Sequence, residues 1–511
     1  MKKTRTQYAI LNSSIALSIQ ILKIILTFIN RTVFIYVLGV YYLGLNGLFS
    51  SILSVLSLAD LGVSSAMAYS LYKPLSENDK QKISDYVKLF KKIYNVIAFT
   101  ILIIGTVLTF FLKFLIKEPI TTEIVIIYYL FLFNSVISYL FTYKRVLLEA
   151  DQKKYIITLT DFLVLLIGSI VQIIVILVFK NYYLYLIITI LITFISNIAI
   201  SIIVNKDYAY FKKENQNSIS EKEKRTFVDN IKGLFFSKIG EVVVNGTDNI
   251  LMSSFIGLTA VGLYSNYNMI IYTANTTITL ILTAMMGSVG NLIHHKDSNI
   301  KRLLDFFKKY EFLVFTISYM ASISLLIFLN IVVELWLGSQ FLLPKHIILI
   351  IVVNFYITIY RLSSLTLITG FGLFSEQKLK ALFEAIFNLI FSIILVKYTS
   401  LGIFAVLLGT LISSFATVMW YEPYSLFKYG FKISIKEYSK VMLKRYSFTI
   451  ITFIVLYFLL DYIKYNMVTN ILISMLLLLI ISIIYLIINY QKPEFIYFKN
   501  IFLNIIKRKK V

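Results

Sequence analysis

The sequence predicts an all-α integral membrane protein with about fourteen transmembrane helices. Of its 511 residues, 59% are hydrophobic and 15% are charged, and the mean hydropathy of +0.82 is far above that of a soluble domain of this length. Apolar runs of about 20 residues or more recur along the chain between short charged segments, which is typical of polytopic helical membrane proteins. The distribution of basic residues gives these runs a consistent topology.

Fourteen apolar segments are long enough to cross a bilayer as helices. The opening residues lead into a span that is too long and too polar for the apolar core of a cleavable signal peptide. The fourteen expected spans cover approximately residues 9–38, 43–72, 86–112, 121–143, 155–179, 182–205, 228–256, 260–293, 308–333, 345–371, 379–396, 401–427, 441–460 and 466–490.

The net charge of +23 is distributed to one side of the expected membrane. Most of the 49 Lys and Arg residues fall in the N-terminus, the C-terminal tail and every second loop. The positive-inside rule therefore predicts that both termini are cytoplasmic. The excess charge then marks topology and contact with anionic membrane lipids, and we expect no nucleic-acid partner. The loops on the other side hold only Lys113, Lys117, Lys180, Lys345, Lys397 and Lys464.

An internal repeat relates the first six spans to the next six. The segment LGVYYLGL at Leu38–Leu45 recurs as IGLTAVGL at Ile256–Leu263, 218 residues further along the chain. Six spans preserve the orientation in the membrane, so we expect two six-helix lobes related by a parallel pseudo-repeat. Two further matches have nearly the same offset: Ile176–Val178 with Ile394–Val396, and Tyr143-Lys144 with Tyr360-Arg361.

The repeat predicts three parts of the chain. Residues 1–215 form an N-terminal six-helix lobe, and residues 216–430 form a C-terminal six-helix lobe. Residues 431–511 add two transmembrane helices and a basic tail. The polar segment at 205–233 reads as a cytoplasmic linker between the lobes.

A polar stripe runs through the otherwise apolar first span. Gln20, Lys23, Asn30 and Arg31, together with Thr27, have spacings that place them on one helical face. A charge at mid-membrane costs about 2.5–3.5 kcal/mol and is tolerated mainly where it faces a bundle interior or an aqueous cavity. The stripe therefore predicts that this face of the span looks away from lipid.

The offset of 218 maps this stripe onto a second one in the seventh span. Equivalent faces of the two spans are expected to face each other, with Lys23 and Arg31 opposite carboxylates. Two interpretations remain: the walls of a transport cavity, or a static network of salt bridges that holds helices together. The residues of the second stripe are Lys238, Glu241, Asn245, Asp248 and Asn249.

Two more charges lie within predicted spans. Asp60 is followed by Gly62 and several small residues, so it is either a carboxylate at a broken helix near the site or a packing residue bonded to its neighbours. Arg361 is a candidate anion ligand, but Glu384 in the next span is an available structural partner.

The composition favours a protein without catalytic, metal or cofactor chemistry. The chain has no cysteine and only three histidines, of which His294 and His295 are adjacent in a polar loop. We therefore expect neither a metal site nor a cofactor, and no enzyme activity.

The fourteen-span pattern resembles that of the Wzx-type polysaccharide repeat-unit flippases. Two segments carry the likeness: FINRTVFIYVLGVYYLGLNGLFSSILSVLSLADLGVSSAMAYSLYKPLSENDK at Phe28–Lys80 and LLEADQKKYI at Leu147–Ile156. These flippases belong to the multidrug/oligosaccharidyl-lipid/polysaccharide exporter superfamily, and the likeness is to capsular or exopolysaccharide members from Gram-positive bacteria. The resemblance implies two six-helix lobes, often with two further helices, in the bacterial cytoplasmic membrane.

The resemblance also implies a substrate and a site. The substrate would be an undecaprenyl-diphosphate-linked oligosaccharide repeat unit that is moved from the inner to the outer leaflet by alternating access. Lys23 and Arg31 fall about where related flippases have basic residues of a central cavity, and Lys238 and Arg361 are further candidate cations. The acidic Glu241 and Asp248 depart from a purely cationic site and leave room for H⁺ or Na⁺ as coupling ion. Other polysaccharide-synthesis proteins are candidate partners.

Two other functions are compatible with a membrane protein of this kind. A cation-coupled multidrug exporter of the same superfamily would share the fold, but it would prefer cationic substrates. A polysaccharide polymerase or ligase would usually expose a large outer loop with catalytic residues, whereas the longest outer loop here is about residues 333–344.

Overall fold

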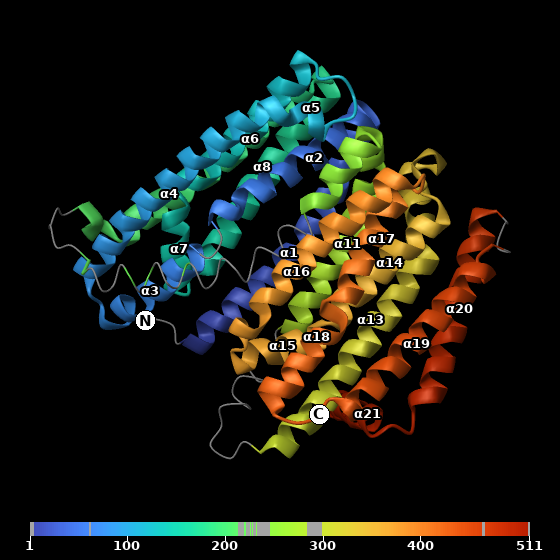
Figure 1. The fold of residues 1–511 in the computed structure, drawn as a ribbon. Coiled ribbons are helices and arrows are strands. Elements are labelled where there is room, and N and C mark those ends of the chain that lie inside the picture. Colours follow the sequence, from blue (N-terminus) through green and yellow to red (C-terminus); the bar gives the residue numbers. More distant parts are fainter. Residues whose placement is uncertain are drawn as a thin grey trace. The chain divides into compact units, whose positions relative to one another are not determined.

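The structure is a computed structural model that describes residues 5–60, 63–212, 219–220, 225, 227, 231, 246–283, 299–461 and 466–508. All regular secondary structure in these ranges is helical, which confirms the all-α fold class. The chain divides into two compact units, Met1–Ser265 and Asn266–Val511. The boundary falls within α11 (Leu258–Thr283), and each unit is a bundle of long helices (Figure 1).

The first unit consists of long apolar helices joined by short turns. Side chains at several helix starts accept a hydrogen bond from a backbone N–H group of the first turn, including Asp79, Thr121 and Asn181. Its helices are α1 (Arg5–Leu38), α2 (Val40–Leu56), η1 (Ser57–Asp60), α3 (Val63–Glu77), α4 (Lys80–Leu108), η2 (Thr109–Phe111), α5 (Leu112–Leu115), α6 (Thr122–Leu140), α7 (Thr142–Ala150), α8 (Lys154–Phe179), α9 (Tyr182–Asp207), η3 (Ala209–Lys212), a stretch at 246–255 and the start of α11.

Glycines allow close helix packing in the first unit. A Cβ atom on Gly105 of α4 would overlap Leu132 of α6, and one on Gly168 of α8 would overlap Ile192 of α9. Small residues at such crossings let helix backbones approach closely in membrane proteins. Through these contacts α4 packs against α6, and α8 packs against α9. In addition, α6 contacts α9, and α1 packs along α8.

The second unit continues with α11 and contains the longest helix of the chain, α13. Asn299 and Asn466 cap α13 and α20 in the same way as the caps of the first unit. Its other helices are α13 (Ile300–Leu337), η4 (Ser339–Phe341), α14 (Lys345–Tyr360), α15 (Leu362–Phe371), α16 (Phe374–Tyr398), α17 (Ile403–Ala416), α18 (Val418–Ser425), the π-helix η5 (Leu426–Phe431), α19 (Lys436–Leu459), α20 (Met467–Asn489) and α21 (Pro493–Arg508).

Four helices of the second unit run side by side, and two more pack outside α13. Figure 1 shows α16, α17, α14 and α13 as neighbours, with α19 and α20 as a hairpin next to α13. Gly409 of α17 allows the closest of these packings, because a Cβ atom there would overlap Ser392 of α16. The two final long helices are thus attached to the bundle through α13.

The described helices match the predicted spans. Eleven of them are long and apolar enough to cross a membrane, and α2 is a shorter apolar helix. The expected eighth span corresponds to α11, which is more polar because it carries many Thr and Asn residues. The expected seventh span lies largely outside the described residues, apart from the helical stretch at 246–255. The chain is therefore a multi-pass membrane protein.

Several spans are broken rather than continuous. The second is interrupted between α2 and α3 by η1. In the fourth, α6 stops before Phe141, and α7 begins directly after that residue. The tenth breaks at Arg361 and the twelfth at Thr417. Such breaks free backbone groups that must find other partners, so they are accommodated where protein or water surrounds them.

The C-terminal region differs from the expectation in one respect. The predicted basic tail after the last span is not a plain tail, because Pro493–Arg508 forms α21. Proline at the first helical position suits a helix start, since its missing N–H group has no intrahelical partner there.

Candidate functional site

Arg31 of α1 lies against the start of α11. Its Nη2 atom donates a hydrogen bond to the backbone carbonyl of Ser265 at 2.9 Å, and Tyr185 of α9 is close enough to interact with it electrostatically. The Nε atom is buried and has no hydrogen-bond partner among the described residues. Within the described part of the chain, no carboxylate lies within ion-pair distance of Arg31. A guanidinium held only by neutral oxygen atoms retains capacity for an anion.

The surroundings of Ser265 bring the two predicted stripes together within the first unit. A Cβ atom on Gly47 of α2 would lie 2.9 Å from Ser265 Oγ and 3.8 Å from Asn249 Nδ2. Asn249 donates to Ser51 Oγ at 2.9 Å. We call Arg31, Gly47, Ser51, Asn249 and Ser265 the Arg31 cluster. Its side chains come from α1, α2, the stretch at 246–255 and α11, and the only charge among them is that of Arg31.

Of the rest of the stripe on α1, Gln20, Lys23 and Asn30 are half-buried and Thr27 is exposed. Asn30 donates to Ser169 Oγ of α8 at 2.8 Å, and its Oδ1 atom is buried without a hydrogen-bond partner in the part of the chain that the structure describes. Gln20 and Lys23 make no hydrogen bond or ion pair to any residue that the structure describes. Lys23 is therefore a second cation of α1 with no carboxylate against it in the described ranges.

Asp60 lies at the break of the second span. It ends η1, and Ser64 at the start of α3 donates to its Oδ2 atom at 3.3 Å. The same Ser64 hydroxyl is 2.6 Å from the hydroxyl of Tyr94, which is fully buried. The structure has a helix break at Asp60, one of the two interpretations of this residue, and the carboxylate belongs to a small hydroxyl network there.

The second stripe is described only in part. Lys238, Glu241 and Asn245 lie outside the described residues. Asp248 is half-buried and interacts electrostatically with Tyr264, and Asn249 belongs to the Arg31 cluster. The expected pairing of Lys23 and Arg31 with carboxylates of this stripe therefore remains a prediction.

Arg361 is engaged by two carboxylates in the second unit. Its Nη2 and Nε atoms donate to Glu422 at 2.5 and 3.1 Å, and its Nη1 atom donates to Glu384 at 3.1 Å. Lys380 pairs with the same Glu422 at 2.7 Å. Two cations and two carboxylates balance here, so Arg361 has the structural partner that was expected in Glu384 and a second one in Glu422.

A second buried pair was not anticipated from the sequence. Arg445 of α19 donates to Glu311 of α13 at 2.7 Å, and Tyr360 donates to the other oxygen of Glu311 at 2.6 Å. The guanidinium lies 4.5 Å from the ring centre of Phe315. Arg445 lies only four residues inside the predicted span 441–460, and the sequence analysis did not single it out among the charges within spans. An Arg within one turn of a span end, with a Glu in another span at similar depth, is the signal that points to such a pair.

The first unit has a corresponding pair near the end of its fourth span. Arg145 of α7 donates to both oxygens of Asp161 at 2.8 and 3.0 Å, and it also bonds Asn197. Its neighbour Lys144 donates to Ser201 and to Asn205. Burial, with repulsion from Lys91, lowers the pKa of Lys144. The sequence comparison drew attention to Lys144, whereas the carboxylate pair belongs to Arg145.

Glycines make α2 and α11 cross at close range. A Cβ atom on Gly44 would overlap the carbonyl oxygen of Leu258, and one on Gly262 would overlap that of Val40. The two contacts are reciprocal at the repeat offset of 218 residues. The Glu118 carboxylate accepts the backbone N–H of Leu258 at 2.8 Å and so caps α11.

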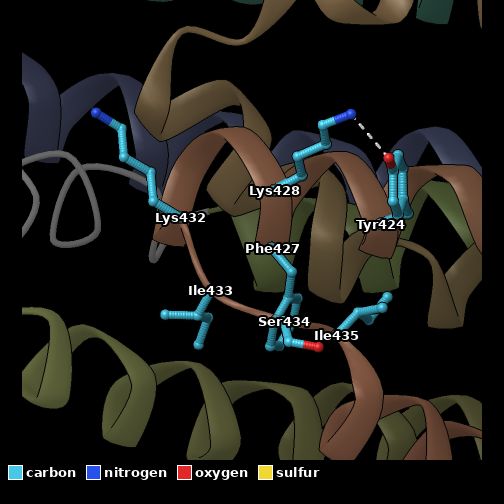
Figure 2. A pocket seen from close by; sticks show the side chains of 7 residues that line it. All are labelled: Tyr424, Phe427, Lys428, Lys432, Ile433, Ser434 and Ile435. Atoms are coloured by element: carbon cyan, nitrogen blue, oxygen red, sulfur yellow. Dashed lines mark hydrogen bonds between the residues drawn. The ribbon is translucent and has the colours of Figure 1, made fainter.

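A cavity of about 430 Å³ opens at the end of α18, away from the predicted site residues. In Figure 2, Lys428 extends toward the Tyr424 hydroxyl, 2.9 Å away, and Lys432 extends away from it. None of the predicted site residues lines this cavity. In the described ranges, no group of three His, Asp or Glu residues has the arrangement of a metal site.

The fold defines a class of protein. The chain is similar to the lipid II flippase MurJ in an inward closed conformation, with a TM-score of 0.65 and 17% identity over 93% of this chain and 99% of that one. It is also similar to an inward-facing multidrug resistance MATE family transporter of the MOP superfamily, with a TM-score of 0.61 and 15% identity over 82% of this chain and 99% of that one. A mutant of the Vibrio cholerae MATE transporter VcmN matches with a TM-score of 0.56 and 13% identity over 84% of this chain and 99% of that one. The chain therefore has the fold of MOP-superfamily transporters.

The family follows from the sequence match. The model of the polysaccharide biosynthesis protein family matches residues 10–286, more than half of the chain. The chain belongs to this family, which confirms the resemblance to polysaccharide exporters. No curated protein sequence matches it significantly.

Proposed function

We propose that the chain is a flippase that moves undecaprenyl-diphosphate-linked oligosaccharide repeat units from the inner to the outer leaflet of the bacterial cytoplasmic membrane. One observation carries this proposal: α1 holds two cations, Lys23 and Arg31, that contact no carboxylate in the described part of the chain. The family of polysaccharide biosynthesis proteins supports a saccharide-bearing substrate for capsule or exopolysaccharide synthesis.

The chemistry of α1 suits a diphosphate. Arg presents planar N–H donors to phosphate oxygens, and Lys contributes a mobile point charge. Lys23 and Arg31 are eight residues apart, or about 12 Å along the helix. With the N-terminus in the cytoplasm, Lys23 is the inner of the two. In this account Lys23 receives the diphosphate first and Arg31 binds it nearer the outer leaflet.

The proposed cycle is alternating access. The hydrophilic glycan and the diphosphate follow the polar face of α1, while the polyprenyl chain stays in lipid. In this proposal the reciprocal contacts of Gly44 and Gly262 are the seam between α2 and α11 that closes the outer end of the path. Separation of this seam would open the path outward.

Coupling to H⁺ or Na⁺ is assigned to the acidic residues near this path. Asp60 is the best-supported carboxylate, because it lies at a helix break beside the hydroxyl groups of Ser64 and Tyr94. Asp248 and Glu241 are the other candidates. Lys238 and Arg361 complete the proposed substrate cations, although the two carboxylates on Arg361 favour a structural role for that residue.

A cation-coupled multidrug exporter is the second candidate, because MATE transporters share the fold. The charges of α1 weigh against it. A cationic drug would meet Lys23 and Arg31, which have no neighbouring carboxylate among the described residues, and like charges in a site of low dielectric constant repel strongly.

Complementation of a deletion strain tests the proposal. Arg31→Ala and Lys23→Ala are expected to abolish surface polysaccharide and to cause lipid-linked repeat units to accumulate on the inner leaflet. The exposed Lys397→Ala, at equal protein level, serves as the matched control. Normal polymer in both α1 variants would contradict the proposal, and loss of drug resistance with normal polymer would favour the exporter.

A further inference from the structure

The last helix, α21, differs in kind from the long helices before it. It covers Pro493–Arg508 and follows α20 after the short turn at 490–492. A helix of this length extends about 24 Å, which is short of the ~30 Å apolar core of a bilayer. It is not among the helices apolar enough to cross a membrane. Since α20 does cross, α21 begins at the membrane surface.

The sequence of α21 is amphipathic. Apolar residues recur at positions 495, 498, 502 and 505, and polar residues recur at positions 500, 504 and 507. Both sets have the three- and four-residue spacing of a helical face. A helix with one apolar and one polar face, placed at a membrane surface, lies in the interface rather than across it.

The first half of α21 is anchored to protein. Lys309 of α13 lies 4.3 Å from the ring centre of Tyr497, and Phe495 and Phe498 are half-buried. Three apolar side chains on the flanks of the helix are open, namely Ile496, Ile501 and Leu503, which are 44%, 39% and 42% exposed. Open apolar side chains beside the end of a transmembrane helix are positioned to meet lipid.

The charge of this region identifies the kind of lipid surface. From residue 490 to the end, the chain carries the single carboxylate Glu494 and the basic residues Lys492, Lys499, Lys507, Arg508, Lys509 and Lys510. The positive-inside rule places this end of α20 in the cytoplasm. Basic segments next to a membrane span are attracted to anionic lipids of the inner leaflet.

We propose that α21 is an interfacial helix that binds the anionic inner surface of the membrane and is held to α13 through Tyr497 and Lys309. The apolar side chains enter the headgroup region, and the basic residues contact lipid phosphates. In this way the helix fixes the cytoplasmic end of the second unit to the bilayer. The proposal is independent of the transported substrate.

The absence of cysteine from the chain makes a direct test simple. Leu503→Cys and its exposed polar neighbour Asn504→Cys, each in the full chain, are labelled with an environment-sensitive fluorophore. The proteins are reconstituted in phosphatidylcholine nanodiscs with and without phosphatidylglycerol. The label at 503 is expected to emit at shorter wavelength and to be quenched by brominated lipid, more strongly with phosphatidylglycerol, while the label at 504 reports water.

Three results would overturn the proposal. Equal, water-like emission at both positions would show that α21 does not lie on the membrane. A shielded label at 503 that brominated lipid does not quench would indicate a protein contact instead. Quenching could also be the same with and without phosphatidylglycerol, and unchanged in the double variant Lys499→Gln, Lys507→Gln. That result would show that anionic lipid has no part in binding.

Discussion

The buried cations of the two units differ in their partners. In the second unit Arg361 and Lys380 share Glu384 and Glu422, and Arg445 pairs with Glu311. In the first unit Arg31 donates to a backbone carbonyl and keeps one buried N–H group without a partner. Carboxylates thus neutralise these cations of the second unit, as Asp161 neutralises Arg145 in the first, whereas Arg31 has no carboxylate partner among the described residues.

This difference separates charges that maintain structure from charges that are available to a ligand. Removing one partner of a buried ion pair leaves an uncompensated charge and is strongly destabilising. A buried cation without a carboxylate already bears that desolvation cost in the native state, which is expected where function requires the charge. Substitutions at Glu422, at the Glu311–Arg445 pair and at Arg31 test this division. They are given together with one at the α2–α11 crossing, in order of their expected effect on stability.

The largest effect is expected for Glu422→Ala. Glu422 is fully buried and accepts from both Arg361 and Lys380, so its loss leaves two cations with only Glu384. We expect a loss of about 3–5 kcal/mol in the free energy of unfolding. Thermal unfolding of the purified protein in detergent measures it, with the exposed Glu437→Ala as the control that should change little.

The Glu311–Arg445 pair shows whether the loss of stability comes from the broken ion pair or from the unpaired charge that stays buried. Arg445→Met alone leaves the Glu311 carboxylate buried with only Tyr360, and we again expect a loss of several kcal/mol, on the order of 3. Glu311→Leu combined with Arg445→Met should restore most of it, since apolar replacements of a buried pair are often neutral. A double mutant as unstable as the single one would mean that the ion pair itself stabilises the fold.

A smaller effect is expected at the α2–α11 crossing. Gly262→Val forces the two helices apart, because even a Cβ atom would overlap the carbonyl of Val40. Overpacking of this kind typically costs about 1–3 kcal/mol. If the crossing is the outer seam, the transport rate should fall further than the loss of folded protein explains. The exposed Ser50→Ala on α2 should alter neither transport nor stability.

The smallest effect on stability is expected for Arg31→Met. The substitution removes one hydrogen bond to a carbonyl, but it also removes a buried, incompletely paired charge. The lost hydrogen bond is worth about 1 kcal/mol, and the desolvation cost that the substitution relieves is similar in size. The melting temperature should therefore change little or rise. A melting temperature lowered as much as by Glu422→Ala would assign Arg31 to the structural class.

The spans could be predicted from the sequence because they depend on local composition, and apolar runs predicted nearly every long described helix. The small residues after Asp60 made a break in the second span one of two interpretations, whereas the breaks at Phe141, Arg361 and Thr417 were not predicted. The C-terminal helix α21 was missed because its apolar positions are interrupted by Lys499 and read as a tail. Amphipathic spacing rather than mean hydropathy is the property that defines such a helix.

The partners of the charges were predicted less well. Glu384 was found for Arg361 because it lies in the next span, but Glu422 was not, since it is 61 residues away and lies near a span end. Arg445 and Glu311 are even further apart along the chain. Ion pairs between spans depend on how helices cross, which hydropathy and spacing within one helix do not describe.

Direct binding tests the central claim, that Arg31 is held available for an anionic substrate. Purified wild-type protein and Arg31→Met are compared for binding of an undecaprenyl-diphosphate-linked oligosaccharide in nanodiscs, alongside their melting temperatures. Loss of a charge-assisted contact worth about 1.5–3 kcal/mol predicts a Kd roughly ten- to hundredfold weaker, with no loss of stability. Unchanged binding, or weaker binding that only accompanies a lower melting temperature, would contradict the account.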